Sequence, residues 1–159
     1  MERILLNGAL ELTSPDGFRR LNEEEIKKFN FANEMPGCVL QNEERHVIIS
    51  LAWRKVNALL SKLFSVKELA GRMADYIADA DKDYGHKRGD SFAGTVAGEK
   101  AAGFNYSYTV EEVGMDARVI ITRHRGHFYY MYFYFRSANR EESLKLIEQI
   151  VSSMQWKEK

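Results

Sequence analysis

The sequence predicts an α+β domain in which helices lie against an antiparallel sheet. Two segments, residues 46–55 and 104–111, alternate apolar and polar side chains, which is typical of strands. Two others, residues 65–85 and 139–156, repeat apolar side chains at every third or fourth position, which is typical of helices. Strand patterns follow one another from residue 91 to residue 136 without an intervening helix, which indicates an antiparallel meander.

The chain has 159 residues, a length typical of one domain, and we expect residues 1–159 to form a single folded unit. Its first third should contain short strands at residues 9–14 and 18–21, separated by a Pro-Asp-Gly turn. A short helix should begin at Asn22, because Glu25, three positions later, completes a capping box.

An apolar connection, ALLSKLFS at residues 58–65, lies between the strand at residues 46–55 and the first long helix. Two interpretations are open for it. It forms an extra helical turn packed on the edge of the sheet, or it forms an apolar flap over a groove. The second interpretation makes Leu60 and Phe64 candidate residues for binding a protein partner.

The first long helix should begin after Ser65 and end at Gly85, since Ser65 and Glu68 form a second capping box and glycine is favoured just beyond a helix. The last helix should be capped by Asn139 and Glu142. Its inward side chains are predicted to be Leu144, Ile147, Val151 and Met154.

The last hairpin contains the stretch HFYYMYFYFR at residues 127–136, in which seven of ten side chains are aromatic. Its register depends on its turn. A two-residue turn would place Arg125 where a positive φ is needed, so a three-residue turn of His124, Arg125 and Gly126 is predicted. This turn pairs Ile121 with Tyr129, Val119 with Met131 and Ala117 with Phe133, and a two-residue turn would exchange the faces.

In this register, the side chains that form an apolar core face are Tyr129, Met131, Phe133 and Phe135. The opposite face carries Tyr130, Tyr132 and Tyr134, which we call the tyrosine face. Arg118 should lie opposite Tyr132, and Asn105, Ser107 and Thr109 should share this face. It is either covered by a helix, with each tyrosine ring buried, or it is an open surface that binds a peptide or small ligand.

Composition excludes several classes of function. Lysine plus arginine equals aspartate plus glutamate at 23 each, so no global field favours nucleic acid or an anionic membrane. The one cysteine, Cys38, and the lack of a signal-peptide pattern favour a cytoplasmic protein. No segment has the roughly 20 apolar residues of a membrane-inserted helix. No cofactor, metal site or catalytic constellation is indicated.

Four stretches carry a resemblance to a known family: SPDGFRRLNEEE at residues 14–25, GEKAAGFNYSYTV at 98–110, FYYMYFYF at 128–135 and SMQW at 153–156. Together they resemble the PsbP-like superfamily, which includes PsbP, the Ran-release factor, DcrB lipoproteins and adaptor chaperones of type VI secretion. The resemblance implies a PsbP-like α/β/α sandwich, with an antiparallel sheet of about six strands flanked by helices. It also implies a non-enzymatic binding or assembly protein, but it transfers no binding residue.

We therefore expect a non-enzymatic cytoplasmic binding module whose partner is an unidentified protein or peptide. A homodimer is compatible with the sequence. The alternatives are an adaptor chaperone that shelters apolar helices of a client and a small-ligand binder that uses the tyrosine face. The candidate binding residues are Arg118, Tyr130, Tyr132, Tyr134, Leu60 and Phe64.

Overall fold

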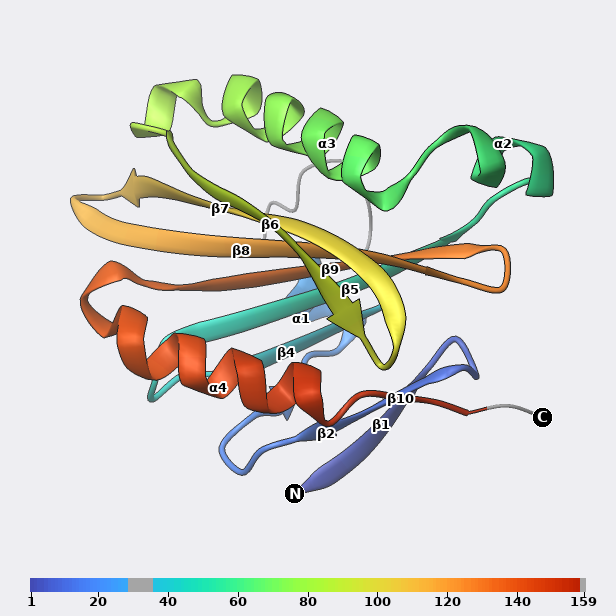
Figure 1. Cartoon of the computed structure of the whole chain (residues 1–159). Coiled ribbons are helices and arrows are strands. Elements are labelled where there is room, and N and C mark those ends of the chain that lie inside the picture. The colour runs from blue at the N-terminus through green and yellow to red at the C-terminus, as the bar shows by residue number, and fades with distance from the viewer. Residues whose placement is uncertain (29–35, 158–159) are drawn as a thin grey trace.

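The computed structural model describes residues 1–28 and 36–157, and its largest element is a seven-stranded antiparallel sheet with helices on both faces (Figure 1). The predicted α+β class is confirmed, with seven strands in this main sheet in place of about six. The strand order is β3-β4-β5-β9-β8-β7-β6. The strands are β3 (Arg19–Arg20), β4 (Cys38–Asn42), β5 (Val47–Lys55), β6 (Lys87–Val96), β7 (Glu99–Val110), β8 (Val113–His124) and β9 (His127–Arg136).

A second sheet of three strands joins the two ends of the chain, in the order β1-β2-β10. Its strands are β1 (Glu2–Leu6), β2 (Leu10–Ser14) and β10 (Gln155–Trp156). The sequence pattern did not predict β1 or β10, because residues 155–156 were expected to continue the last helix. The Trp156 ring instead stacks on the His124 ring, with centroids 3.9 Å apart, and so ties the small sheet to the main one.

The helices are α1 (Glu23–Lys27), α2 (Ala58–Leu63), α3 (Val66–Ala80) and α4 (Arg140–Ser152), with 3₁₀ turns at Lys82–Tyr84 and Ser137–Asn139. The capping box of α1 is confirmed: Glu25 N donates to Asn22 Oδ1 at 2.9 Å, and Asn22 N donates to Glu25 Oε1 at 3.1 Å. Asn139 is the N-cap residue of α4, as predicted, but its side chain makes no capping bond, because a 3₁₀ turn leads directly into α4.

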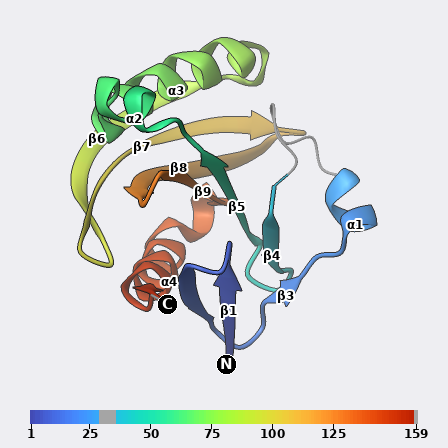
Figure 2. The ribbon, with the colours of Figure 1, turned by 90° about the vertical axis from the view of Figure 1, so that its right-hand side faces the viewer.

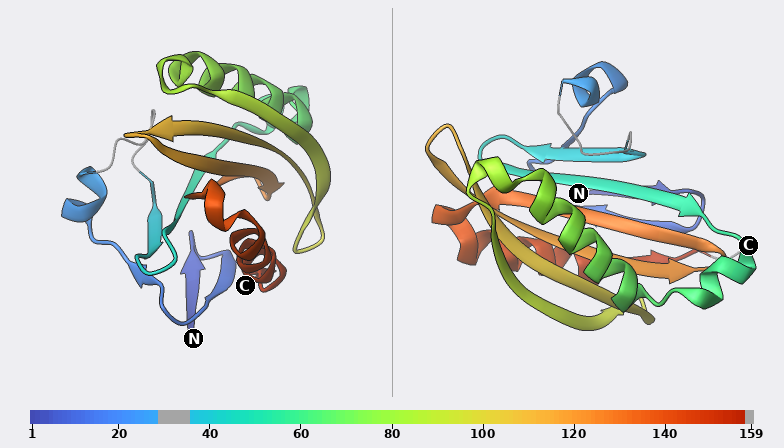
Figure 3. Two further views of the ribbon diagram at one scale, coloured as in Figure 1. Left: turned by 90° about the vertical axis from the view of Figure 1, so that its left-hand side faces the viewer. Right: turned by 90° about the horizontal axis from the view of Figure 1, so that it is seen from above.

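The main sheet separates two hydrophobic cores. α4 and the small sheet cover one side of the main sheet, which we call the α4 side. α3 covers the opposite side, which we call the α3 side (Figures 1 and 3). Buried residues of the α4 side include Leu10, Met131, Phe133, Ile147 and Ile150. Those of the α3 side include Ala70, Ile77, Val119, Ile121 and Tyr130. The α4 helix buries Leu146, Ile147 and Ile150 most deeply. Of the predicted inward side chains, Ile147 and Met154 are buried, whereas Leu144 and Val151 are only partly buried.

Three hairpins of the main sheet turn in two residues, and both residues of each turn have a positive φ: Ala97 and Gly98, Glu111 and Glu112, Arg125 and Gly126. Such type I′ turns match the right-handed twist of the strands that they join. The three-residue turn predicted at Gly126 is therefore wrong. The twist of the meander outweighs the cost of about 1–2 kcal/mol for a non-glycine residue, here Arg125 with φ of 46°, in the left-handed region.

The two-residue turn changes the partners of every residue in the last hairpin. It pairs Ile121 with Tyr130, Val119 with Tyr132 and Ala117 with Tyr134, in place of the predicted Tyr129, Met131 and Phe133. The tyrosine face consequently continues over the apolar residues of β8. The prediction that Tyr129, Met131, Phe133 and Phe135 belong to the core is confirmed, since all four are buried. The expectation that a two-residue turn would exchange the faces is wrong, because both faces of β9 are packed against a core.

The left-handed conformation of Gly126 predicts how a substitution there changes the free energy of unfolding. Gly126 has φ of 78°, so Gly126→Ala should lower the free energy of unfolding by about 1 kcal/mol, because an added Cβ is strained in this region. Gly94 has no neighbouring atom within 4 Å of a built Cβ and no positive φ, so Gly94→Ala is the matched control and should change little. Urea unfolding measures both, and equal values for the two variants would contradict the turn.

Candidate binding surfaces

The tyrosine face lies beneath α3, which runs across the sheet in the right-hand view of Figure 3. Tyr130 is 8% exposed, and Tyr132 and Tyr134 are half-buried. The Tyr132 hydroxyl donates to Met73 Sδ on α3 at 3.4 Å. The tyrosines thus form part of a second core, as in the first of the two interpretations of this face.

The neighbours of the tyrosine face on β7 are aromatic and not the predicted Asn105, Ser107 and Thr109. Phe104 is opposite Val119 and Tyr106 is opposite Ala117, so the β7 residues that share the face are Phe104, Tyr106 and Tyr108. The prediction for Asn105, Ser107 and Thr109 is wrong because it followed the wrong hairpin register. With the correct register, the α3 side of the sheet is almost continuously aromatic and aliphatic.

The tyrosine hydroxyls are held in their neutral form. Burial raises the pKa of Tyr108 and of Tyr132 to about 12 each. Burial also raises the pKa of Tyr106 and of Tyr134, and a hydrogen bond between these two hydroxyls raises the pKa of Tyr106 and lowers that of Tyr134. The chemistry of this face is that of a satisfied aromatic core.

Arg118 lies on the opposite side of the sheet from the tyrosine face. It pairs with Phe133, and its Nε donates to Asn105 Oδ1 at 2.9 Å. Its guanidinium carbon is 5.2 Å from the centroid of the Phe92 ring, and burial lowers its pKa. The predicted juxtaposition of Arg118 with Tyr132 is wrong, so these two side chains do not line one site.

The apolar connection forms α2, which the remaining structure holds firmly at one end of the molecule. Figure 2, which views this end, shows α2 beside the end of β5 and far from α1. Asn57 Oδ1 accepts a bond from Leu59 N at 2.8 Å, which caps the helix. Val56 N donates to Gly126 O at 2.7 Å, and the Arg123 guanidinium donates to Ser61 O. These bonds fix α2 to the β8–β9 hairpin.

Two leucines of α2 face solvent. Leu59 is 69% exposed and Leu63 is 60% exposed, and their spacing of four residues puts them on one face of the helix. Phe64, a predicted binding residue, is half-buried, and the guanidinium carbon of Arg72 lies 4.6 Å from its ring centroid. Leu60, also predicted, lies within α2, but its side chain is outside the part of the structure that is described.

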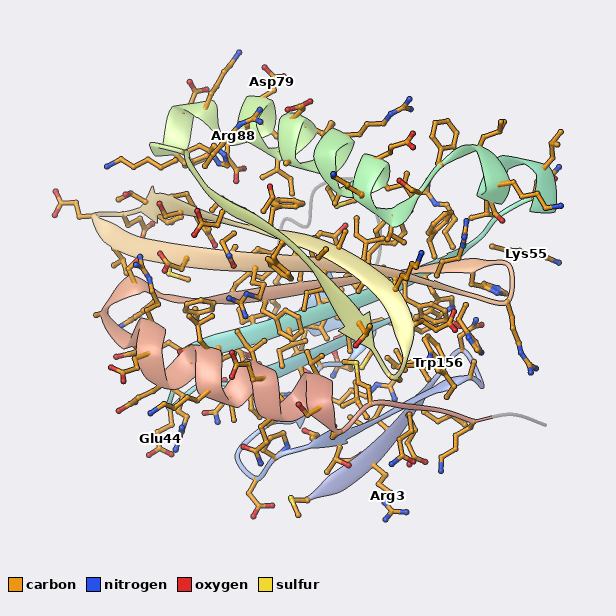
Figure 4. All side chains as sticks on the ribbon, in the orientation of Figure 1. Arg3, Glu44, Lys55, Asp79, Arg88 and Trp156 are labelled. Carbon is orange, nitrogen blue, oxygen red and sulfur yellow. The ribbon has the colours of Figure 1, made fainter. Side chains whose placement is uncertain are left out.

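Three lysines flank these leucines in the sequence: Lys55 at the end of β5, Lys62 on α2 and Lys67 in the first turn of α3. All three are exposed, and Figure 4 shows Lys55 at this end of the molecule. We call Lys55, Leu59, Lys62, Leu63 and Lys67 the α2 surface. Leu59 and Leu63 were not among the predicted binding residues, although the capping Asn57 indicates where α2 begins and so which side chains share a face.

No helix in residues 1–28 and 36–157 is long and apolar enough to cross a membrane. Over the same residues, no group of three or more His, Cys, Asp and Glu side chains is placed to hold a metal ion.

The buried tyrosines predict a loss of stability at alkaline pH. An unfolded tyrosine has a pKa of 10.0, whereas Tyr108 and Tyr132 ionise near 12 in the folded chain. The unfolded chain therefore releases protons first, so the free energy of unfolding should fall from about pH 10 toward about pH 12. Tyr132→Phe, which lacks the ionisable hydroxyl, should lose less stability over this window in urea titrations. An identical alkaline loss in wild type and variant would count against this burial.

Comparisons with known proteins support the fold. Neither protein-family models nor curated protein sequences yield a match to the chain. Among solved structures, it is similar to cyanobacterial PsbP (CyanoP) from Synechocystis sp. PCC 6803, with 16% identity, a TM-score of 0.70, and 98% of this chain and 92% of that chain covered.

Two further structures are similar over nearly the whole chain. The Ran-binding protein Mog1p of Saccharomyces cerevisiae has 9% identity and a TM-score of 0.59, with 97% of this chain and 94% of that chain covered. LpqN of Mycobacterium tuberculosis, involved in cell envelope biogenesis, has 12% identity and a TM-score of 0.57, with 94% and 83% covered. The chain therefore has the PsbP-like fold that its sequence motifs indicated.

Proposed function

We propose that the chain is a non-catalytic binding module that docks a protein or peptide partner on the α2 surface. The observation that carries this proposal is the exposure of Leu59 and Leu63, 69% and 60%, on a helix that Asn57 caps and that Arg123 of β8 bonds at Ser61 O. Exposed apolar side chains rimmed by charged ones are typical of protein interfaces.

The energetics of the α2 surface favour docking. Burying a leucine side chain fully stabilises a complex by about 1.5–3 kcal/mol. Because α2 is already ordered by Asn57 and Arg123, little backbone entropy is lost when a partner binds. Leu59 and Leu63 would then act as the central anchors, and the lysines as the rim.

The buried titratable groups also fit a non-catalytic protein. The Cys38 thiol is 1% exposed, and burial raises its pKa, so it stays a neutral thiol, which is a poor nucleophile. Burial raises the pKa of all five tyrosine hydroxyls beneath α3, so they are neutral as well. A protein partner also agrees with the description of Mog1p, a protein of the same fold, as Ran-binding.

An adaptor chaperone that shelters apolar helices of a client is the second candidate, because the same two leucines would contact such a helix. The small-ligand alternative has less support: Arg118 lies on the far side of the sheet, and α3 covers the tyrosines.

A pair of leucine substitutions tests the proposal. Leu63→Asp should lower the amount of a specific partner captured from the native cytosol at least tenfold, because a carboxylate replaces a buried anchor. Leu5→Asp is the matched control, because Leu5 is 52% exposed on the small sheet. This variant should capture the partner as wild type does. Tyr132→Ala should reduce stability without abolishing capture. A partner that Leu63→Asp and Leu5→Asp capture equally would refute docking on the α2 surface.

A further inference from the structure

Although the net charge is zero, an exposed lysine and several pairs of exposed glutamates lie at opposite ends of the main sheet. β5 ends at Lys55, where β9 begins with His127, so α2 and the β8–β9 turn share one end of the main sheet. Three exposed pairs of glutamates lie in the β4–β5 turn, in the β7–β8 turn and at the start of α4: Glu43 and Glu44, Glu111 and Glu112, Glu141 and Glu142. Figure 4 shows Lys55 and Glu44 at opposite ends of the molecule.

The lysines of the α2 surface have no carboxylate partners within the described residues: Lys55, Lys62 and Lys67 form no ion pair there. The nearest acidic residue in sequence, Glu68, accepts a bond from Ser65 Oγ at 3.3 Å. Arg123 on the adjoining hairpin, whose guanidinium donates to Ser61 O, adds a further cation. The end of the molecule that exposes Leu59 and Leu63 therefore carries a positive potential.

We propose that the segment docked on the α2 surface is an amphipathic helix of a partner protein, in which carboxylate side chains flank the apolar stripe. This inference rests on the proposed function and names the chemistry of its partner. Leu59 and Leu63, one turn apart, offer a ridge to the apolar stripe, and the carboxylates of the partner face Lys55, Lys62 and Lys67.

At the β8–β9 hairpin beside α2, the order of the sheet excludes strand addition. β8 and β9 are each hydrogen-bonded to a strand on both sides, whereas residues 52–55 of β5 pair with β9 and not with β4. An extended peptide therefore finds no strand edge on the hairpin itself, and recognition there must use side chains. A helix that lays its apolar face against exposed leucines is the recurring mode that meets this condition.

An anionic membrane fits the α2 surface less well than an acidic helix. Two leucine side chains carry fewer carbon atoms than one myristoyl chain, which alone gives only marginal membrane binding. A second copy of the chain is also a weaker occupant. Its β7–β8 turn combines Glu111 and Glu112 with exposed Val110 and Val113, but it is a narrow turn and would build an open head-to-tail array.

Two synthetic peptides of about four helical turns test the chemistry. Both carry the same leucine stripe, flanked by glutamates in one and by lysines in the other. Fluorescence anisotropy should show that the wild-type chain binds the acidic peptide at least about tenfold more tightly than the basic peptide. Added salt should reduce this difference in affinity. Lys62→Glu with Lys67→Glu should reverse the preference, which a merely destabilised variant would not do.

The outcomes separate the two proposals. If both peptides bind equally and Leu63→Asp abolishes both, the carboxylate inference fails while docking on the α2 surface stands. If neither peptide binds and Leu63→Asp captures the native partner as wild type does, both proposals fail. If the chain binds phosphatidylserine vesicles but not the acidic peptide, the partner of the α2 surface is a membrane and the helix proposal fails. If the chain self-associates and Glu111→Lys abolishes this association, the partner is a second copy and the helix proposal also fails.

Discussion

The two-residue turn at Arg125 and Gly126 is the constraint on which the two faces of the sheet depend. Because side chains alternate along a strand, the length of this turn decides which residues of β8 accompany the tyrosines of β9. It aligns Val119 and Ile121 with Tyr132 and Tyr130, and it sends Arg118 to the α4 side. The same turn receives the bond from Val56 N that leads the chain into α2.

This register gives the protein two cores in place of one core and one open platform. On the α3 side, small residues such as Ala70 and Ala74 let α3 lie close to large rings, among them Tyr132 and Tyr134. The rings supply apolar area, and their hydroxyls find partners in one another and in Met73. With this face covered, the apolar side chains that remain for a partner lie at the end of the sheet, on α2.

Local patterns in the sequence predict the elements well, because period and capping are local properties. The alternation in β5 and the capping box at Asn22 are confirmed, whereas α3 ends at Ala80 and Gly85 ends the 3₁₀ turn that follows it. Features set by tertiary structure were predicted poorly. Arg125 adopts a positive φ because the twist of the meander requires it, and β10 leaves the helical pattern because β2 offers it an edge. The cytoplasmic location and the single domain stay predictions.

The α2 surface lies within residues 55–67, but the sequence alone does not show which of its leucines face solvent. Lys55, Lys62 and Lys67 look unremarkable in a neutral sequence, and only the fold places the end of β5 away from the glutamate pairs. Site-specific photo-crosslinking tests the central claim most directly. A photoreactive side chain at position 63 should give one dominant cross-linked protein from native cytosol, and the same group at position 5 should not. Equal cross-linking from positions 63 and 5, or none from 63, would contradict the account.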